Sequence, residues 1–228
     1  MADTSTPGSS AGGASADARE TNTAGNPLLE RAYALSDADE ARVLYDEWAD
    51  TYDTELTDET QGYVGPAVAA ETVARVAGVD GEILDAGCGT GLVGVALADR
   101  GAAAIDGVDL SPGMLEKAKA TGVYRRLAPA DLSRPLPVAA DSYDVVVCVG
   151  TLTHGHVGPG AFGEFVRLAR PGGTIVATVL DDIWDSGGYR AEVDRLAQMA
   201  MVEIVSTDVV DYRKAADVSA RMVVLRVA

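Results

Sequence analysis

The chain has 228 residues, of which 47% are apolar, enough for one globular α/β domain with a sizeable core. Its formal net charge is −17, because 35 Asp and Glu outnumber 18 Lys and Arg, and such a surface repels the phosphates of nucleic acids and anionic membranes. No apolar run is long enough to cross a bilayer. We therefore expect a cytoplasmic protein, monomeric or homodimeric, whose partner is a small molecule rather than a nucleic acid or a membrane.

The first segment, residues 1–26, consists mostly of Ser, Thr, Gly, Ala and Asp and has no large apolar side chain after Met1. Such a segment cannot offset its own ordering entropy, so we expect a disordered tail. It also lacks the basic start and the apolar run of a signal peptide. We expect residues 27–80 to form N-terminal helices and residues 81–228 to form the core.

An aromatic stripe occurs in the first helical region. Tyr45, Trp48 and Tyr52 stand at positions i, i+3 and i+7, which places them on one face of a helix. Stripes of this kind more often pack into a core than line a ligand site, and both interpretations are open at this point.

A glycine-rich turn follows the first expected strand, which is apolar and ends on Asp85. Residues 87, 89 and 91 are all glycine, and glycines at a strand-to-helix turn let the main chain approach a ligand closely. With Gly94 the segment also satisfies the pattern G-x-G-x-x-G, and Asp109 lies 109 − 89 = 20 residues beyond Gly89, where dinucleotide-binding folds keep a ribose-binding acid. An NAD-dependent oxidoreductase is therefore one interpretation.

Asp85 favours a different ligand. A fixed carboxylate beside the glycine turn would repel a pyrophosphate but attract the ammonium group of a methionine moiety, so S-adenosylmethionine (SAM) fits the charge pattern better than NAD. The alternative is that Asp85 only caps the next helix.

Two more acids end expected strands. Asp109 comes before the helix start Ser111-Pro112 and can accept hydrogen bonds from both ribose hydroxyls. Asp131 follows a third apolar segment and can accept from the adenine amino group, while Leu110 and Leu132 sandwich the ring. A solvated loop position is the alternative for Asp131.

Taken together, these motifs resemble the class I SAM-dependent methyltransferases, whose first motif matches residues 85–91. Residues 141–150 resemble that family's fourth strand, and residues 168–176 its helix-turn-strand entry into the fifth. Segments 44–53, 62–66 and 150–159 resemble the small Williams-Beuren-region methyltransferase-like group. The resemblance implies a Rossmann-like fold, N-terminal helices that cap the cofactor, and a SAM site whose residues are Tyr45, Tyr52, Asp85, Gly87, Gly89, Asp109, Leu110, Met114, Asp131, Leu132 and Val149.

Strands and helices alternate from residue 83 to about residue 201, which predicts a parallel sheet with helices on both faces. Two apolar β-rich segments, 201–210 and 220–227, follow and are close enough for a hairpin. We therefore expect a doubly wound, mostly parallel seven-stranded sheet with an antiparallel last strand.

Both histidines of the chain, His154 and His156, fall in the loop after the fourth strand, near the expected positions of Asp181 and Asp182. We expect His154 to act as a general base that Asp181 or Asp182 orients, with Asp181 as the second catalytic residue. The alternative is a loop histidine bonded to the backbone. A metal held by these four side chains is a weaker interpretation, and no C-x-x-C spacing indicates a zinc site.

The sequence thus predicts a SAM-dependent methyltransferase that acts on a small molecule, with methylation of oxygen favoured over nitrogen or sulfur. Two alternatives are an NAD-dependent oxidoreductase and a SAM-binding protein without methyltransferase activity. A metal is not expected.

Overall fold

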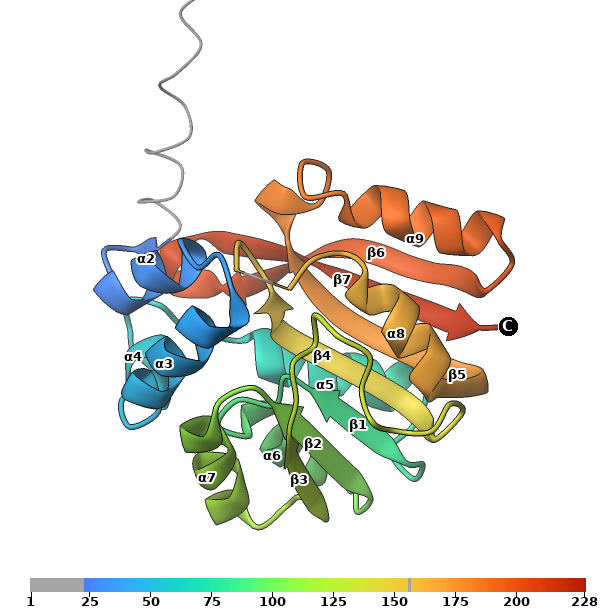
Figure 1. Ribbon diagram of the computed structural model, residues 1–228, viewed down its shortest axis with the longest axis horizontal. Helices are drawn as coiled ribbons and strands as arrows, with labels where there is room; N and C mark the ends of the chain where they lie inside the picture. Colours follow the sequence, from blue (N-terminus) through green and yellow to red (C-terminus); the bar gives the residue numbers. More distant parts are fainter. Residues whose placement is uncertain (1–22, 156) are drawn as a thin grey trace, which may run out of the picture.

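The computed structural model describes residues 23–155 and 157–228 and contains a seven-stranded sheet in the order β3-β2-β1-β4-β5-β7-β6 (Figure 1). Strands β1 to β5 pair in parallel, and β7 runs antiparallel to both β5 and β6. The doubly wound sheet with an antiparallel last strand is confirmed. The strands are β1 (Ile83–Ala86), β2 (Ile105–Asp109), β3 (Arg126–Pro129), β4 (Tyr143–Leu152), β5 (Ala169–Leu180), β6 (Val202–Arg213) and β7 (Val218–Val227).

Helices cover both faces of this sheet. Figure 1 shows α5 and α6 behind the sheet and α8 and α9 in front of it. None of the described helices is both long and apolar enough to cross a membrane. The helices are α2 (Pro27–Tyr33), α3 (Ala38–Trp48), α4 (Tyr52–Thr57), α5 (Gly65–Val76), α6 (Leu92–Ala98), α7 (Pro112–Thr121), α8 (Ala161–Leu168) and α9 (Tyr189–Gln198), with 3₁₀ turns η1 (Asp181–Ile183) and η2 (Lys214–Ala216).

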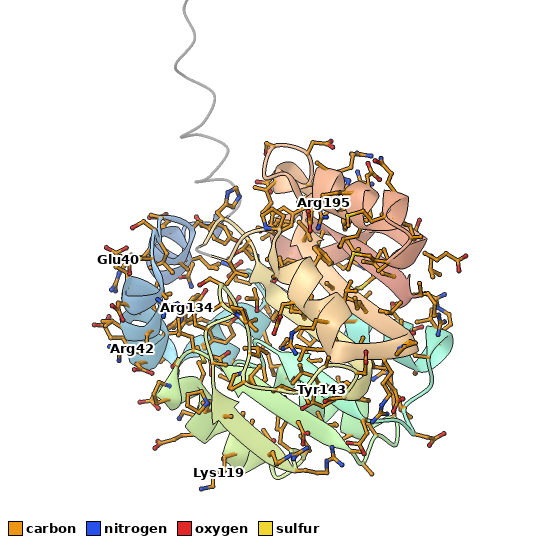
Figure 2. The ribbon with its side chains drawn as sticks, turned by 45° about the vertical axis from the view of Figure 1, so that its right-hand side comes forward. Glu40, Arg42, Lys119, Arg134, Tyr143 and Arg195 are labelled. Atoms are coloured by element: carbon orange, nitrogen blue, oxygen red, sulfur yellow. The ribbon has the colours of Figure 1, made fainter. Side chains whose placement is uncertain are left out.

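The central strands are buried on both faces because helices lie above and below them. All four residues of β1 are buried, and so is the run from Val145 to Val149 in β4. Continuous apolar runs of this kind are typical of a parallel sheet. Charged side chains such as Glu40, Arg42, Lys119 and Arg195 instead project from the surface (Figure 2).

The N-terminal region, residues 27–80, divides into two parts. Helix α5 packs against β4, β5 and α6, so it belongs to the layer that covers the sheet. Helices α3 and α4 lie at the carboxyl edge of the sheet, where their side chains reach the loops after β1 and β2. We call α3 and α4, residues 38–57, the lid.

Residues 23–26 were expected to be disordered, but the structure orders them. Thr23 is buried and its carbonyl oxygen accepts a hydrogen bond from Gln61 Nε2 at 2.9 Å. The Asn26 side chain caps α2 and donates to Glu55 Oε2 at 3.0 Å. These hydrogen bonds with Gln61 and Glu55 stabilise residues 23–26, whose own small polar side chains bury too little apolar surface to offset the ordering entropy. The remainder of the expected tail, residues 1–22, lies outside the described residues.

Tyr124, just before β3, packs beneath the glycine turn. A Cβ atom built on Gly94 would lie 2.3 Å from Tyr124 Cζ and Oη, and one built on Gly91 or Gly107 would also press on the ring. The Tyr124 hydroxyl accepts from Gly94 N at 3.2 Å and donates to Asp85 Oδ2 at 2.7 Å. Gly94, the third glycine of the G-x-G-x-x-G pattern, is therefore needed to make room for the Tyr124 ring. Its presence is explained without a bound pyrophosphate.

Replacement of Gly94 by alanine should destabilise the protein by about 1–3 kcal/mol, because the added methyl group overlaps a ring that two hydrogen bonds hold in place. The matched control is Gly163→Ala in α8, where nothing lies within 4 Å of the added atom. That change should stabilise by about 0.5–1 kcal/mol through helix propensity. Urea unfolding of both variants measures the difference, and equal free energies of unfolding would show that Tyr124 moves aside freely.

Asp85 is fully buried at the end of β1, and this burial raises its pKa to about 7 although the Tyr124 hydroxyl opposes the shift. Below about pH 4 the carboxyl group is protonated in both the folded and the unfolded chain. Between there and about pH 7 only the folded chain keeps the proton, so rising pH lowers the stability over this window.

The Asp85→Asn variant carries no such titration, and its amide oxygen can still accept from Tyr124. Its free energy of unfolding, relative to the unmodified protein, should therefore rise by about 2 kcal/mol between about pH 5 and about pH 8. Denaturant unfolding of both proteins across this range gives the difference directly. A difference that stays constant with pH would mean that Asp85 is ionised throughout.

Candidate functional site

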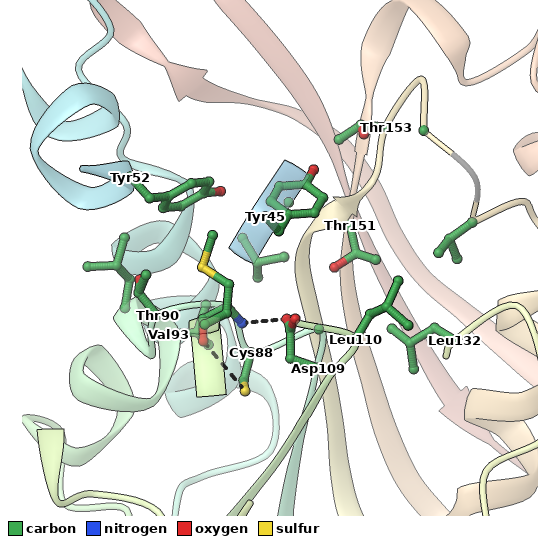
Figure 3. Close-up of a pocket in the computed structure, with 18 of the residues that line it drawn as sticks. Tyr45, Tyr52, Cys88, Thr90, Val93, Asp109, Leu110, Leu132, Thr151 and Thr153 are labelled. Carbon is green, nitrogen blue, oxygen red and sulfur yellow. Dashed lines mark hydrogen bonds between the residues drawn. The ribbon is translucent and has the colours of Figure 1, made fainter. Parts of the chain in front are cut away.

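A cleft opens at the carboxyl edge of the sheet, between the lid and the loops after β1, β2 and β4 (Figure 3). Its empty space, including the open mouth, is ≈ 860 Å³, which is in the range of small-molecule sites. Carboxyl ends of parallel strands are where such folds bind ligands. Nine of the residues expected at a cofactor line the cleft: Tyr45, Tyr52, Gly87, Gly89, Asp109, Leu110, Met114, Leu132 and Val149.

Asp109 is held rigidly at the end of β2. Its Oδ2 accepts from Gly89 N at 2.8 Å and its Oδ1 accepts from Ser111 N at 2.9 Å. Burial raises the pKa of Asp109, and these backbone N–H groups act in the opposite direction. The carboxylate therefore faces the cleft in one orientation, and each oxygen keeps lone pairs for hydroxyl groups of a ligand.

The glycine turn exposes bare backbone to the cleft. Gly87 has φ of +77° and Gly89 has φ of +53°, a left-handed conformation that side chains other than glycine rarely adopt. Nothing lies within 4 Å of a Cβ built on Gly89, whereas one built on Gly87 would lie 2.1 Å from Thr151 Oγ1. The first glycine is therefore required by the close approach of Thr151 near the end of β4, and the second leaves space for a ligand.

Aromatic rings from the lid close the opposite side of the cleft (Figure 3). Tyr45 and Tyr52 line it, with their ring centroids 6.5 Å apart. Trp48 is instead buried behind them, stacked on Tyr45, with its Nε1 donating to Glu55 Oε2 at 3.0 Å. Trp48 of the aromatic stripe thus packs in the core, whereas Tyr45 and Tyr52 line the cleft, so both interpretations of the stripe apply.

Acidic side chains attach the lid to the loops that form the cleft. Asp46 Oδ1 accepts from Ser111 Oγ at 2.5 Å and from Gly113 N at 2.9 Å, at the start of α7. Asp53 Oδ1 accepts from Thr90 Oγ1 at 2.5 Å, in the glycine turn. The lid therefore rests on the two loops that carry Gly89 and Asp109.

Two of the acids expected at the cofactor do not line the cleft. Asp85 lies beneath its floor and bonds Tyr124, so the expected direct attraction of a ligand ammonium is not what this geometry provides. Asp131 stands between two lining residues, but its side chain turns to Ser133 N and Oγ at 2.9 and 2.6 Å.

The expected catalytic pair also differs. Asp182, rather than Asp181, meets His154, with 3.0 Å between Asp182 Oδ2 and His154 Nε2. Asp181, the expected second catalytic residue, instead accepts from Arg221 Nε at 2.6 Å, away from His154. The His154 ring lies 5.0 Å from the Tyr33 ring and is not among the described side chains that line the cleft. His156 lies outside the described residues.

Several cleft residues were missed in the sequence. Tyr63, Thr151 and Thr153 line the cleft, and the acids Asp46 and Asp53 hold the lid. The first three stand within segments that resemble the methyltransferase-like group, but nothing in their spacing indicates a role. Across residues 23–155 and 157–228, no cluster of three His, Cys, Asp or Glu side chains is arranged to hold a metal ion.

Comparisons with known proteins agree with this geometry. A methyltransferase-domain family model matches residues 83–173. The human methyltransferase-like protein 27 is 35% identical over 77% of this chain and 73% of its own length. A ubiquinone biosynthesis O-methyltransferase of Methylococcus capsulatus is 34% identical over 43% of each chain, so this chain spans less than half of that relative.

The fold also matches a solved structure, the putative methyltransferase in complex with the Trm112 methyltransferase activator of Haloferax volcanii. The TM-score is 0.61, with 21% identity over 82% of this chain and 96% of that one.

The nine expected residues that line the cleft are compatible with SAM. Asp109 suits the ribose, the apolar side chains of Leu110 and Leu132 suit the adenine, and the space over Gly89 suits the methionine moiety. Rings such as Tyr45 and Tyr52 favour a neighbouring cation, and the sulfonium of SAM is one. On the strength of the shared sequence and fold, the chain belongs to the class I SAM-dependent methyltransferases.

Proposed function

We propose that this enzyme transfers the methyl group of SAM to an oxygen atom of a small molecule. The observation that carries the proposal is the size and lining of the site, a cleft with an open mouth that Tyr45 and Tyr52 of the lid cover on one side. A net charge of −17 also disfavours a polynucleotide acceptor. The O-methyltransferase among the relatives is consistent with this assignment.

The residues of the cleft have separate tasks in this proposal. SAM supplies an already activated methyl group, so the protein chiefly aligns the acceptor and excludes water. Asp109 accepts from the ribose hydroxyls, and the adenine packs between Leu110 and Leu132. Tyr45 and Tyr52 close over the methionine end and shield it from solvent.

The test uses SAM with an isotope-labelled methyl group, offered to the protein with a small-molecule extract and, separately, with bulk tRNA. We expect label in low-mass products, with a carbon chemical shift typical of methyl on oxygen. Label in tRNA, or on nitrogen or sulfur, would contradict the proposal.

Two variants connect the result to the cleft. Asp109→Asn should weaken binding of S-adenosylhomocysteine by at least about ten-fold, because the ribose loses a charged acceptor. Asp99→Asn, an exposed position after α6, should leave the affinity unchanged. Calorimetry measures both, and an unaffected Asp109 variant would place the cofactor elsewhere.

A further inference from the structure

A second, smaller cavity continues from the acceptor side of the cleft. Its empty space, including its opening to solvent, is ≈ 330 Å³, and it shares five lining residues with the cleft: Tyr45, Tyr52, Tyr63, Gly150 and Thr153. Its own walls add Tyr33, Trp48, Tyr212 and Arg213. We call this cavity the aromatic chamber. Because the two spaces meet beside the lid tyrosines, a molecule seated in the chamber lies next to the methionine end of the cleft.

The tyrosine hydroxyls at this junction are donors rather than bases. Burial raises the pKa values of Tyr45, Tyr52, Tyr63 and Tyr212 above the ordinary value of a tyrosine, so all four stay protonated near neutral pH. Asp109, the carboxylate of the cleft, stands at the ribose side. In the part of the chain that the structure describes, the acceptor side therefore holds no lining side chain that takes up a proton at neutral pH.

One buried cation, Arg213, lines the aromatic chamber. Arg213 is 1% exposed, and among the described residues it is the one Lys or Arg that lines either cavity. Its guanidinium donates to Gln61 Oε1 at 2.5 Å and to the Tyr33 hydroxyl at 3.1 Å. These contacts fix a cation at the wall of the chamber in a chain that is otherwise strongly acidic.

Tyr63 lies where the chamber meets the cleft and lines both spaces. Its ring meets Tyr212 edge to face at 5.1 Å, and the Tyr212 hydroxyl donates to the Tyr63 hydroxyl at 3.4 Å. Because either hydroxyl of this pair can donate to the other, Tyr63 can turn its proton toward a group in the cleft. A hydroxyl donor that lines the same cavity as a guanidinium suits an anionic oxygen better than a neutral alcohol.

We propose that the methyl acceptor is a small carboxylic acid, bound as the carboxylate with one oxygen on the Tyr63 hydroxyl, where the cleft meets the chamber, and with its apolar part in the cleft against the rings of Tyr45 and Tyr52. This proposal rests on the proposed function. A lone pair of the other carboxylate oxygen forms the new bond to the methyl carbon while the carbon–sulfur bond breaks and leaves its electron pair on sulfur. The carboxylate and the sulfonium become a neutral methyl ester and a neutral thioether, so no proton is transferred and no general base is needed.

The experiment compares matched sets of small compounds that differ only in one group. Each set contains a carboxylic acid, its carboxamide and its primary alcohol, such as phenylacetic acid, phenylacetamide and 2-phenylethanol, with short aliphatic sets in parallel. Thermal stabilisation is measured with the protein saturated with S-adenosylhomocysteine near pH 7.5. In most sets the acid should raise the melting temperature of the protein–S-adenosylhomocysteine complex more than the carboxamide or the alcohol does. By calorimetry, the best acid should bind at least about ten-fold tighter than its alcohol.

The Tyr63→Phe variant tests whether the Tyr63 hydroxyl binds the carboxylate. It should reduce the affinity of the best acid by at least about five-fold, while the affinities for its alcohol and for S-adenosylhomocysteine stay unchanged. The control is Tyr143→Phe, whose hydroxyl bonds Asp106 at a distant part of the sheet and which should change none of the three. Arg213→Gln should abolish the preference for acids. Because Arg213 is buried and this variant can unfold, the Tyr63 variant decides.

The outcomes distinguish failure of the carboxylate assignment from failure of the proposed methyltransferase function. If S-adenosylhomocysteine binds and acids show no preference over amides and alcohols, the carboxylate assignment is overturned and the methyltransferase function stands. The same holds if acids are preferred equally by the protein and by Tyr63→Phe. If S-adenosylhomocysteine does not bind, both proposals fail.

Discussion

The hydrogen bond from Gly89 N to Asp109 Oδ2 joins the carboxyl ends of β1 and β2, and the site depends on it. The two strands are parallel neighbours in register, so their following turns lie side by side. A turn after β1 that must offer an N–H to this carboxylate adopts a left-handed conformation, which restricts the position to glycine. One contact thus fixes both the bare backbone and the orientation of the acid.

The lid extends this arrangement with the same chemistry. Its acids, Asp46 and Asp53, accept from groups at the start of α7 and in the glycine turn, and Asp50 pairs with Lys117 of α7 at 2.6 Å. The polar contacts that hold the lid down are therefore made to the glycine turn and to the start of α7, beside Gly89 and Asp109. If SAM binds as proposed and orders those loops, it should also order the lid, so binding of the cofactor and ordering of the lid should be linked.

Local patterns predicted most of the fold. The apolar runs of β1 and β4, the glycine turn and the Ser111-Pro112 helix start all express preferences of neighbouring residues, and each occurs where the sequence places it. The direction of single side chains was not predictable in this way. Asp181 and Asp182 are adjacent, yet one turns to Arg221 on β7 and the other to His154.

The aromatic chamber was invisible in the sequence for a related reason. Tyr63 and Tyr212 touch across 149 positions of the chain, and Arg213 joins Tyr33 across 180. No spacing rule connects residues so far apart. Asp85 illustrates the converse, because its place in a known motif predicted a direct ligand contact, whereas Tyr124 occupies its side chain.

Amide hydrogen exchange with and without S-adenosylhomocysteine tests the linkage between cofactor and lid most directly. The account predicts that the ligand slows exchange together in the glycine turn, in residues 109–113 and throughout the lid, residues 38–57. Protection confined to the two loops, with the lid exchanging at its unliganded rate, would contradict the claim that the lid and the cofactor site form one unit.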